Sequence, residues 1–104
     1  MFAIFADDAT LVNPLGTYVE GRAAIERMFA DFFADRLKGS QHTSVIRRVH
    51  FPTPDVAIAD GEATLHLANG TSPLVHPFTD VFVRRADRWS LLHVRAYVFM
   101  AQLP

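Results

Sequence analysis

Hydrophobic residues recur with two different periods along the chain, and these periods predict the secondary structure. Between Gly21 and Leu37 the apolar positions lie three and four apart, which is typical of a helix with one buried face. From Gln41 onward the period becomes two, as in strands whose side chains alternate between two faces. We therefore predict a helix over 21–37, followed by strands over 41–51, 56–67, 76–85 and 89–100.

The residues before the helix predict a short hairpin. Thr10–Asn13 and Thr17–Glu20 are strand candidates on either side of a Pro-Leu-Gly turn. Residues 1–6 resemble the last turns of a helix. Asp60-Gly61 predicts a bulge in the second long strand, because the apolar phase shifts there. A single helix with a strand meander predicts an α+β fold with an antiparallel sheet, in one domain over 1–104.

Composition and charge narrow the function. The 104 residues are 50% hydrophobic and 20% charged, and the net charge is -1. Neither half of the chain is strongly basic or acidic. We therefore expect no nucleic-acid partner and no binding to anionic membranes. There is no cysteine, so disulfides and thiolate chemistry are excluded. No apolar run approaches the roughly 18 residues of a membrane span. We expect a cytoplasmic protein.

Motifs for metals and cofactors are missing. His42 and His50 lie on one predicted strand, about 26 Å apart at roughly 3.3 Å per residue, so they cannot share an ion. His66, His76 and His93 have no metal-ligand spacing. We find no glycine-rich phosphate loop and no dinucleotide fingerprint. We therefore expect neither a metal nor a cofactor.

Asp80 is the strongest candidate for chemistry. Phe78, Asp80 and Phe82 share one face of a predicted strand, so the carboxyl group should be desolvated and its pKa raised. Such a group can act as a general acid or hold a ligand. The alternative is a structural carboxylate that pairs with an arginine or with backbone amides. Arg47 is one candidate partner, because Val45 and Val49 are expected to share its face.

The last strand predicts two different faces. Leu92, Val94, Ala96 and Val98 form an apolar set that would line a pocket. The opposite face predicts a homodimer contact, since aromatic residues and arginine are enriched at interfaces; a partly solvated sheet is the alternative. The residues of that face are His93, Arg95, Tyr97 and Phe99.

Several short segments, in this order and spacing, resemble the nuclear transport factor 2-like superfamily and its SnoaL-like (SgcJ/EcaC-type) subgroup. They are 5–10 (FADDAT), 13–16 (NPLG), 20–25 (EGRAAI), 37–40 (LKGS), 54–57 (PDVA) and 82–89 (FVRRADRW). The resemblance covers essentially the whole chain. It implies a cone-shaped, strongly curved antiparallel sheet wrapped around a helix. It also implies that the family's N-terminal helix is truncated here. Either the chain is a shortened variant, in which case a second copy of the chain would cover apolar sheet surface, or its start is not the natural one.

The resemblance also suggests roles for individual residues. Ketosteroid isomerase, a member of the superfamily, has its general base just before the proline of the first hairpin, where this chain has Asn13. An amide cannot serve as that base at neutral pH. The family's acidic oxyanion donor corresponds to Asp80, which is retained and is our candidate catalytic residue. The partner tyrosine would lie on the truncated helix.

These observations predict a protein that binds a small apolar molecule, with isomerase- or cyclase-like chemistry left open. The expected ligand-binding residues are Asn13, Tyr18, Met28, Phe32, Arg47, Phe78, Asp80, Phe82, Val94, Ala96 and Val98. One alternative is a non-catalytic dimerisation or accessory module whose own aromatic side chains fill the pocket. A weaker alternative is an epoxide hydrolase, which needs an Asp-Arg-Asp set; Asp80 and Arg47 would supply two members.

Overall fold

The structure is a computed structural model that describes residues 4–34, 39–68, 70 and 73–97. It contains one helix and six strands. In chain order they are β1 (Phe5–Val12), β2 (Tyr18–Glu20), α1 (Arg22–Ala34), β3 (Gln41–Thr53), β4 (Val56–His66), β5 (Leu74–Arg85) and β6 (Arg88–Ala96). The predicted helix and the four long strands are all present.

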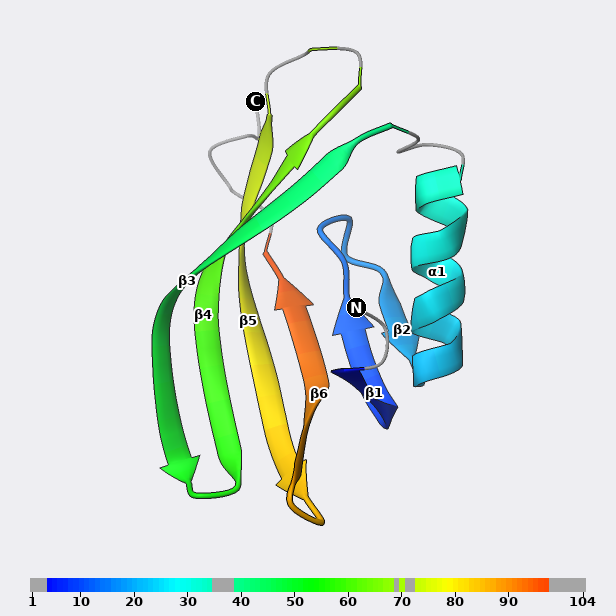
Figure 1. Cartoon of the computed structure of the whole chain (residues 1–104). Coiled ribbons are helices and arrows are strands. Elements are labelled where there is room, and N and C mark those ends of the chain that lie inside the picture. Colours follow the sequence, from blue (N-terminus) through cyan, green and yellow to red (C-terminus); the bar gives the residue numbers. More distant parts are fainter. Residues whose placement is uncertain (1–3, 35–38, 69, 71–72, 98–104) are drawn as a thin grey trace.

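All six strands form one curved sheet, in the order β2-β1-β6-β5-β4-β3 (Figure 1). The α+β fold class is confirmed. One pairing differs from the expected antiparallel sheet: β1 and β6 run parallel, so the sheet is mixed. The two strands can run parallel because the helix and strands β3, β4 and β5 lie between them in the sequence. This long connection lets the chain return to β1 in the same direction.

The helix lies at one end of this sheet. α1 packs on β1 and β2, and Figure 1 shows it standing beside them while β3 arches across to the far edge. Ile25 is fully buried in the helix's contact with β1, in a cluster that includes Leu11 and Leu91. In contrast, β3 is exposed along its whole length. The main apolar core therefore lies under the helix, and the far half of the sheet is thinly covered.

Strand register divides the residues between two faces of the sheet. One row of paired residues carries Leu11, Val94, Asp80, Ala59 and Val49, and its Leu11 end packs against the helix. We call this the helix-side face. Residues that are paired directly across strands point to the same side. The adjacent row points the opposite way and belongs to the outer face; it runs through Thr10, His93, Val81, Ile58 and His50.

The predicted bulge lies in a different strand. The register shifts in β3 between Ile46 and Arg48, opposite Asp60 and Gly61 of β4, which themselves remain in regular pairing with β5. Arg47 is therefore the extra residue. Because a bulge reverses the alternation of the strand that carries it, Val45 and Val49 lie on opposite faces, contrary to the sequence-based expectation.

The start of the chain differs from the prediction. Phe5 and Ala6 are buried residues of strand β1, so the helix predicted for residues 1–6 is wrong at these two positions. Met1–Ala3 lie outside the described residues. Within the described part of the chain, no helix is long and apolar enough to cross a membrane.

Candidate functional site

Asp80 lies on the helix-side face, in the middle of the sheet. Its cross-strand partners are Ala59 of β4 and Val94 of β6, and Phe78 and Phe82 flank it along β5 on the same face. Among the described residues, no side chain or backbone group forms a hydrogen bond or an ion pair with its carboxylate. The carboxylate is thus held among apolar groups without a partner.

This environment changes the acidity of Asp80. Desolvation by burial raises the pKa of its carboxyl group from 3.8 to about 6. Burial disfavours the charged form, and no cation within the described part of the chain offsets this effect. Near neutral pH the group can therefore exchange a proton, accept a hydrogen bond, or pair with a cation brought by a ligand.

A shallow, open depression of about 250 Å³ lies beside Asp80, lined by Phe51, Ala57, Phe82 and Trp89. Phe82 is two residues from Asp80 on the same face, about 7 Å along the strand. The rings of Phe51 and Trp89 meet edge to face, with centroids 6.1 Å apart. Asp80 does not itself line the depression; Phe82 is the lining residue nearest to it along β5, on the same face.

Small side chains on β4 form the floor of this region. Ala57, Ala59, Gly61 and Ala63 alternate along the strand and are all buried. At Gly61 a Cβ atom would collide with the carbonyl oxygen of Val45 and would lie 2.9 Å from Cζ of Phe78. Glycine therefore lets the Phe78 ring lie close to the sheet next to Asp80.

Asn13 and Met28 lie at the helix end of the same face. Oδ1 of Asn13 accepts hydrogen bonds from the backbone N–H groups of Leu15 and Thr17, both at 3.0 Å. Its Nδ2 lies 3.8 Å from the Met28 sulfur. The side chain of Asn13 is buried and closes the turn of the β1–β2 hairpin, so its hydrogen-bonding capacity is largely used by the fold.

Two expected ligand-binding residues lie on the outer face instead. Tyr18 is exposed, and its hydroxyl group donates to Oε2 of Glu20 at 2.9 Å. Arg47 is 3.7 Å from Glu62, whose strand position belongs to the outer face. The suggested pairing of Arg47 with Asp80 is therefore wrong, because the bulge at Arg47 directs it to the other side of the sheet.

Of the remaining residues singled out from the sequence, some lie on the helix-side face and others lie outside the residues that the structure describes. Phe78, Phe82, Val94 and Ala96 lie on the helix-side face with Asp80. The side chain of Phe32, and all of Val98 and Phe99, lie outside what the structure describes.

The depression itself was not predicted from the sequence. Trp89 is 44% exposed and packs against Phe51. The Arg84 guanidinium lies 5.7 Å from the centroid of its ring. No short-range pattern links residues 51, 57, 82 and 89; only the strand register brings them together.

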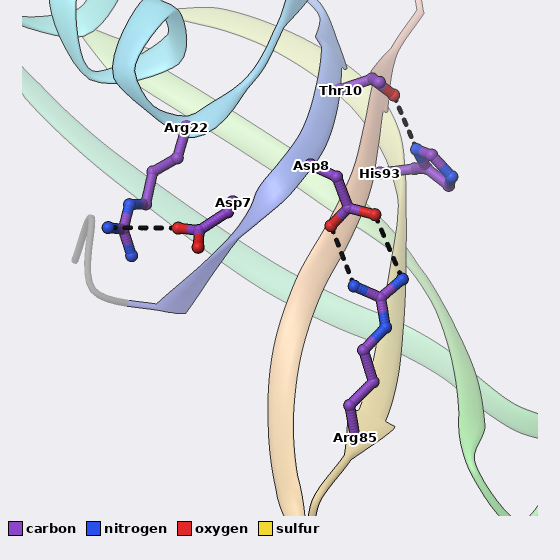
Figure 2. Close-up of polar contacts among 6 residues, drawn as sticks. All are labelled: Asp7, Asp8, Thr10, Arg22, Arg85 and His93. Atoms are coloured by element: carbon purple, nitrogen blue, oxygen red, sulfur yellow. Dashed lines mark hydrogen bonds and ion pairs between the residues drawn. The ribbon is translucent and has the colours of Figure 1, made fainter.

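The outer face carries a polar network that the sequence did not reveal (Figure 2). Arg85 on β5 reaches across β6 and donates two hydrogen bonds to Asp8 on β1, at 2.9 and 3.3 Å. These bonds hold the pKa of Asp8 below its usual value. Asp7, the adjacent residue, points the other way and pairs with Arg22 of the helix.

Beside this pair, Thr10 connects two residues of β6. Nη2 of Arg95 donates to the Thr10 hydroxyl oxygen at 2.9 Å, and that oxygen lies 2.6 Å from Nδ1 of His93. The Thr10 hydroxyl group has one proton and two acceptor lone pairs, so it can accept from Arg95 and still form a hydrogen bond with Nδ1 of His93.

Metal-binding groups do not converge in the described part of the chain. No three histidine, aspartate or glutamate side chains within it lie close enough together to hold an ion. His42 and His50 are on opposite faces of β3 by their pairing with Leu65 and Ile58. His93 belongs to the outer-face network described above.

Comparison with known protein families identifies the chain. Residues 1–100 match the family model of the SnoaL-like domain. The chain belongs to this SnoaL-like family. A search of curated proteins finds no significant relative for this SnoaL-like domain. Its family membership agrees with the resemblance found in the sequence and with the nuclear transport factor 2-like fold of solved structures.

Three solved structures illustrate this similarity. A cystatin-like domain of unknown function from Nostoc punctiforme superimposes with a TM-score of 0.87 at 18% identity. The alignment covers 95% of this SnoaL-like domain and 63% of that chain, so this chain spans less than two thirds of the Nostoc protein.

The other two have provisional functional descriptions. A protein from Thiobacillus denitrificans, provisionally described as a calcium/calmodulin-dependent protein kinase type II association domain, gives a TM-score of 0.78 at 23% identity and coverages of 96% and 80%. A protein from Novosphingobium aromaticivorans, provisionally described as a scytalone dehydratase, gives 0.73 at 16% identity, with coverages of 95% and 68%. At these identities the likeness shows the fold of this SnoaL-like domain alone.

Proposed function

We propose that this protein binds a small, mainly apolar molecule on its helix-side face, with Asp80 at the polar end of the ligand. The observation that carries the proposal is an unpartnered carboxylate next to an open depression lined by aromatic side chains. Apolar walls with few polar groups are typical of small-molecule sites. Phe78, Phe82, Val94 and Ala96 would contact the apolar body.

Asp80 is also the candidate catalytic residue, as a proton donor. A carboxyl group with a pKa of about 6 can donate a proton or a hydrogen bond near neutral pH. Asn13 closes a turn and supplies no base, which favours binding without isomerase chemistry. An epoxide hydrolase function is not favoured, because it would need Arg47 next to Asp80, and Arg47 pairs with Glu62 instead.

A neutral fluorescent apolar probe, N-phenyl-1-naphthylamine, tests the proposal. Phe51 is 60% exposed at the edge of the sheet, so Phe51→Ala should leave the fold intact while removing one wall of the depression. We expect the probe to bind about three- to tenfold more weakly, which corresponds to the loss of roughly 1 kcal/mol of aromatic contact. The control is Val75→Ala, at an apolar β5 position that is 36% exposed and does not line the depression. Equal affinity in the two variants would refute the site.

A second candidate function is an association module that dimerises through its outer face. It is favoured by the exposed ring of Tyr97 on that face, whose hydroxyl donates to Thr79 at 2.8 Å, and by the ring of Tyr18, over which Arg95 lies at 6.0 Å. The Thiobacillus protein is described as an association domain, which is consistent with such a role. His93, Arg95 and Tyr97 would lie at the contact.

We also propose that the protein is cytoplasmic.

A further inference from the structure

The other carboxylates on the described strands each have a charged or hydrogen-bonding partner, and Asp80 does not. Each of four sheet arginines has an acidic partner within 4.0 Å. The pairs are Arg47–Glu62, Arg48–Asp60, Arg84–Asp55 and Arg85–Asp8. Asp80 has no such partner among the described residues, and both of its cross-strand neighbours, Ala59 and Val94, are apolar. A half-buried charge among apolar groups is stabilised most by a cation.

The surface next to Asp80 is also suited to a cation. The faces of aromatic rings carry negative potential, and organic ammonium groups bind to them when water is excluded. Phe78 and Phe82 lie on either side of Asp80, and Phe51 and Trp89 continue the aromatic surface. Trp89 already accepts the guanidinium of Arg84 against its ring at 5.7 Å, which shows that this surface tolerates positive charge.

From this juxtaposition we infer that the ligand is a small organic cation, an ammonium group attached to an apolar body. The ammonium group would pair with the Asp80 carboxylate between Phe78 and Phe82, and the apolar body would fill the depression toward Trp89. An anion would be repelled by Asp80. A neutral apolar molecule would cover the half-buried carboxylate without giving it a partner. The inference rests on the proposed function and specifies the chemistry of its ligand.

Other charged groups on this face are too distant to replace Asp80. His76 and Arg84 are each four residues from Asp80 along β5, which corresponds to about 13 Å, and Arg84 is held by Asp55 at 2.8 Å. The facing positions on β4, β6 and β1 are Ala59, Val94 and Leu11, which do not titrate. The helix contributes Met28 and Phe29 to the core beside them. A pH dependence of cation binding would therefore report on Asp80.

Benzyltrimethylammonium is a suitable probe because its charge does not change with pH, and benzyl alcohol is its neutral counterpart. Binding of each is measured by NMR titration of the unmodified protein at pH 7.5 and pH 5. We expect the cation to bind at least about fivefold more tightly than the alcohol at pH 7.5. Its affinity should fall about tenfold at pH 5, because a group with a pKa of about 6 is then mostly protonated.

Two variants isolate the carboxylate. Asp80→Asn keeps the shape of the side chain and removes its charge, so it should abolish both the preference for the cation and the pH dependence while benzyl alcohol still binds. Asp87→Asn, in the exposed β5–β6 turn, is the matched control and should behave as the unmodified protein.

The possible results separate the two proposals. If benzyl alcohol binds as tightly as the cation at both pH values, the cation inference is wrong and the binding site remains. If neither probe perturbs the residues that line the depression, and the neutral apolar probe also fails to bind, the proposed function is wrong as well.

Discussion

Asp80 is a residue at which stability and binding oppose each other. Its carboxyl group has a pKa of about 6 in the folded protein, against an ordinary value of 3.8. The folded state therefore holds this proton more tightly than the unfolded state does. Stability contributed by the protonated form is complete below about pH 3.8 and is lost as pH rises through about 6.

Replacing Asp80 by Asn should therefore stabilise the protein at neutral pH. We expect the free energy of unfolding at pH 7.5 to rise by about 1–2 kcal/mol, after allowance for partial exposure of the side chain. At pH 3.5 the gain should vanish, because both side chains are then neutral. Urea unfolding at the two pH values measures this. Asp31→Asn, on the exposed surface of α1, is the control and should change little. A gain that is the same at both pH values would contradict the account.

At the scale of elements, the contact between β3 and β4 shapes the binding face. The bulge at Arg47 brings the carbonyl oxygen of Val45 over Gly61, and Phe78 of β5 closes on the same residue. The absence of a side chain at Gly61 is thus required by two neighbouring strands together. It also sets how deeply Phe78 lies beside Asp80.

Gly61→Ala should consequently disturb both strands. We expect the free energy of unfolding to fall by about 2–4 kcal/mol, because the new methyl group meets backbone atoms that cannot move aside. The neutral apolar probe should also bind more weakly as Phe78 shifts. The opposite change at the next position of this face, Ala63→Gly, should lose only about 1 kcal/mol. If urea unfolding shows equal losses for the two variants, the close approach at Gly61 is not a constraint.

At the scale of the whole molecule, the helix covers one end of the sheet and leaves large apolar side chains exposed elsewhere. Val49, Phe51 and Trp89 are 53%, 60% and 44% exposed on the helix-side face, and Tyr97 is 46% exposed on the outer face. Exposed apolar area of this extent favours binding to another molecule. Our two proposals assign the helix-side face to a ligand and the outer face to a second copy of the chain.

Native mass spectrometry can distinguish these assignments. We expect a dimer, and a small added mass if a ligand copurifies with it. Tyr97→Ser should weaken the dimer about tenfold or more, since aromatic residues contribute strongly at interfaces. Trp89→Ser removes an equally exposed aromatic residue from the other face and should leave the dimer intact. A monomeric unmodified protein, or equal effects of the two variants, would refute the outer-face dimer.

Much of the fold could be predicted from local patterns. The three- and four-residue spacing around Ile25, Met28 and Phe29 identified the helix, because one face of a helix must be apolar to be buried. Alternation identified β3 to β6, since neighbouring side chains of a strand point in opposite directions. The same rule placed Phe78, Asp80 and Phe82 together on one face.

Only the tertiary structure could decide how these elements combine. The parallel neighbour of β1, the bulge at Arg47 and the pairing of Arg47 with Glu62 all depend on residues distant in sequence. The depression between Phe51 and Trp89 has the same origin.

The sequence by itself therefore determined the helix, the strands and the apolar surroundings of Asp80, because each depends on periodicity within one segment. Whether that carboxylate has a partner, and what surface lies beside it, was decided by strand register. Register is a property of several strands at once, and a shift of one residue in any of them moves side chains to the other face of the sheet.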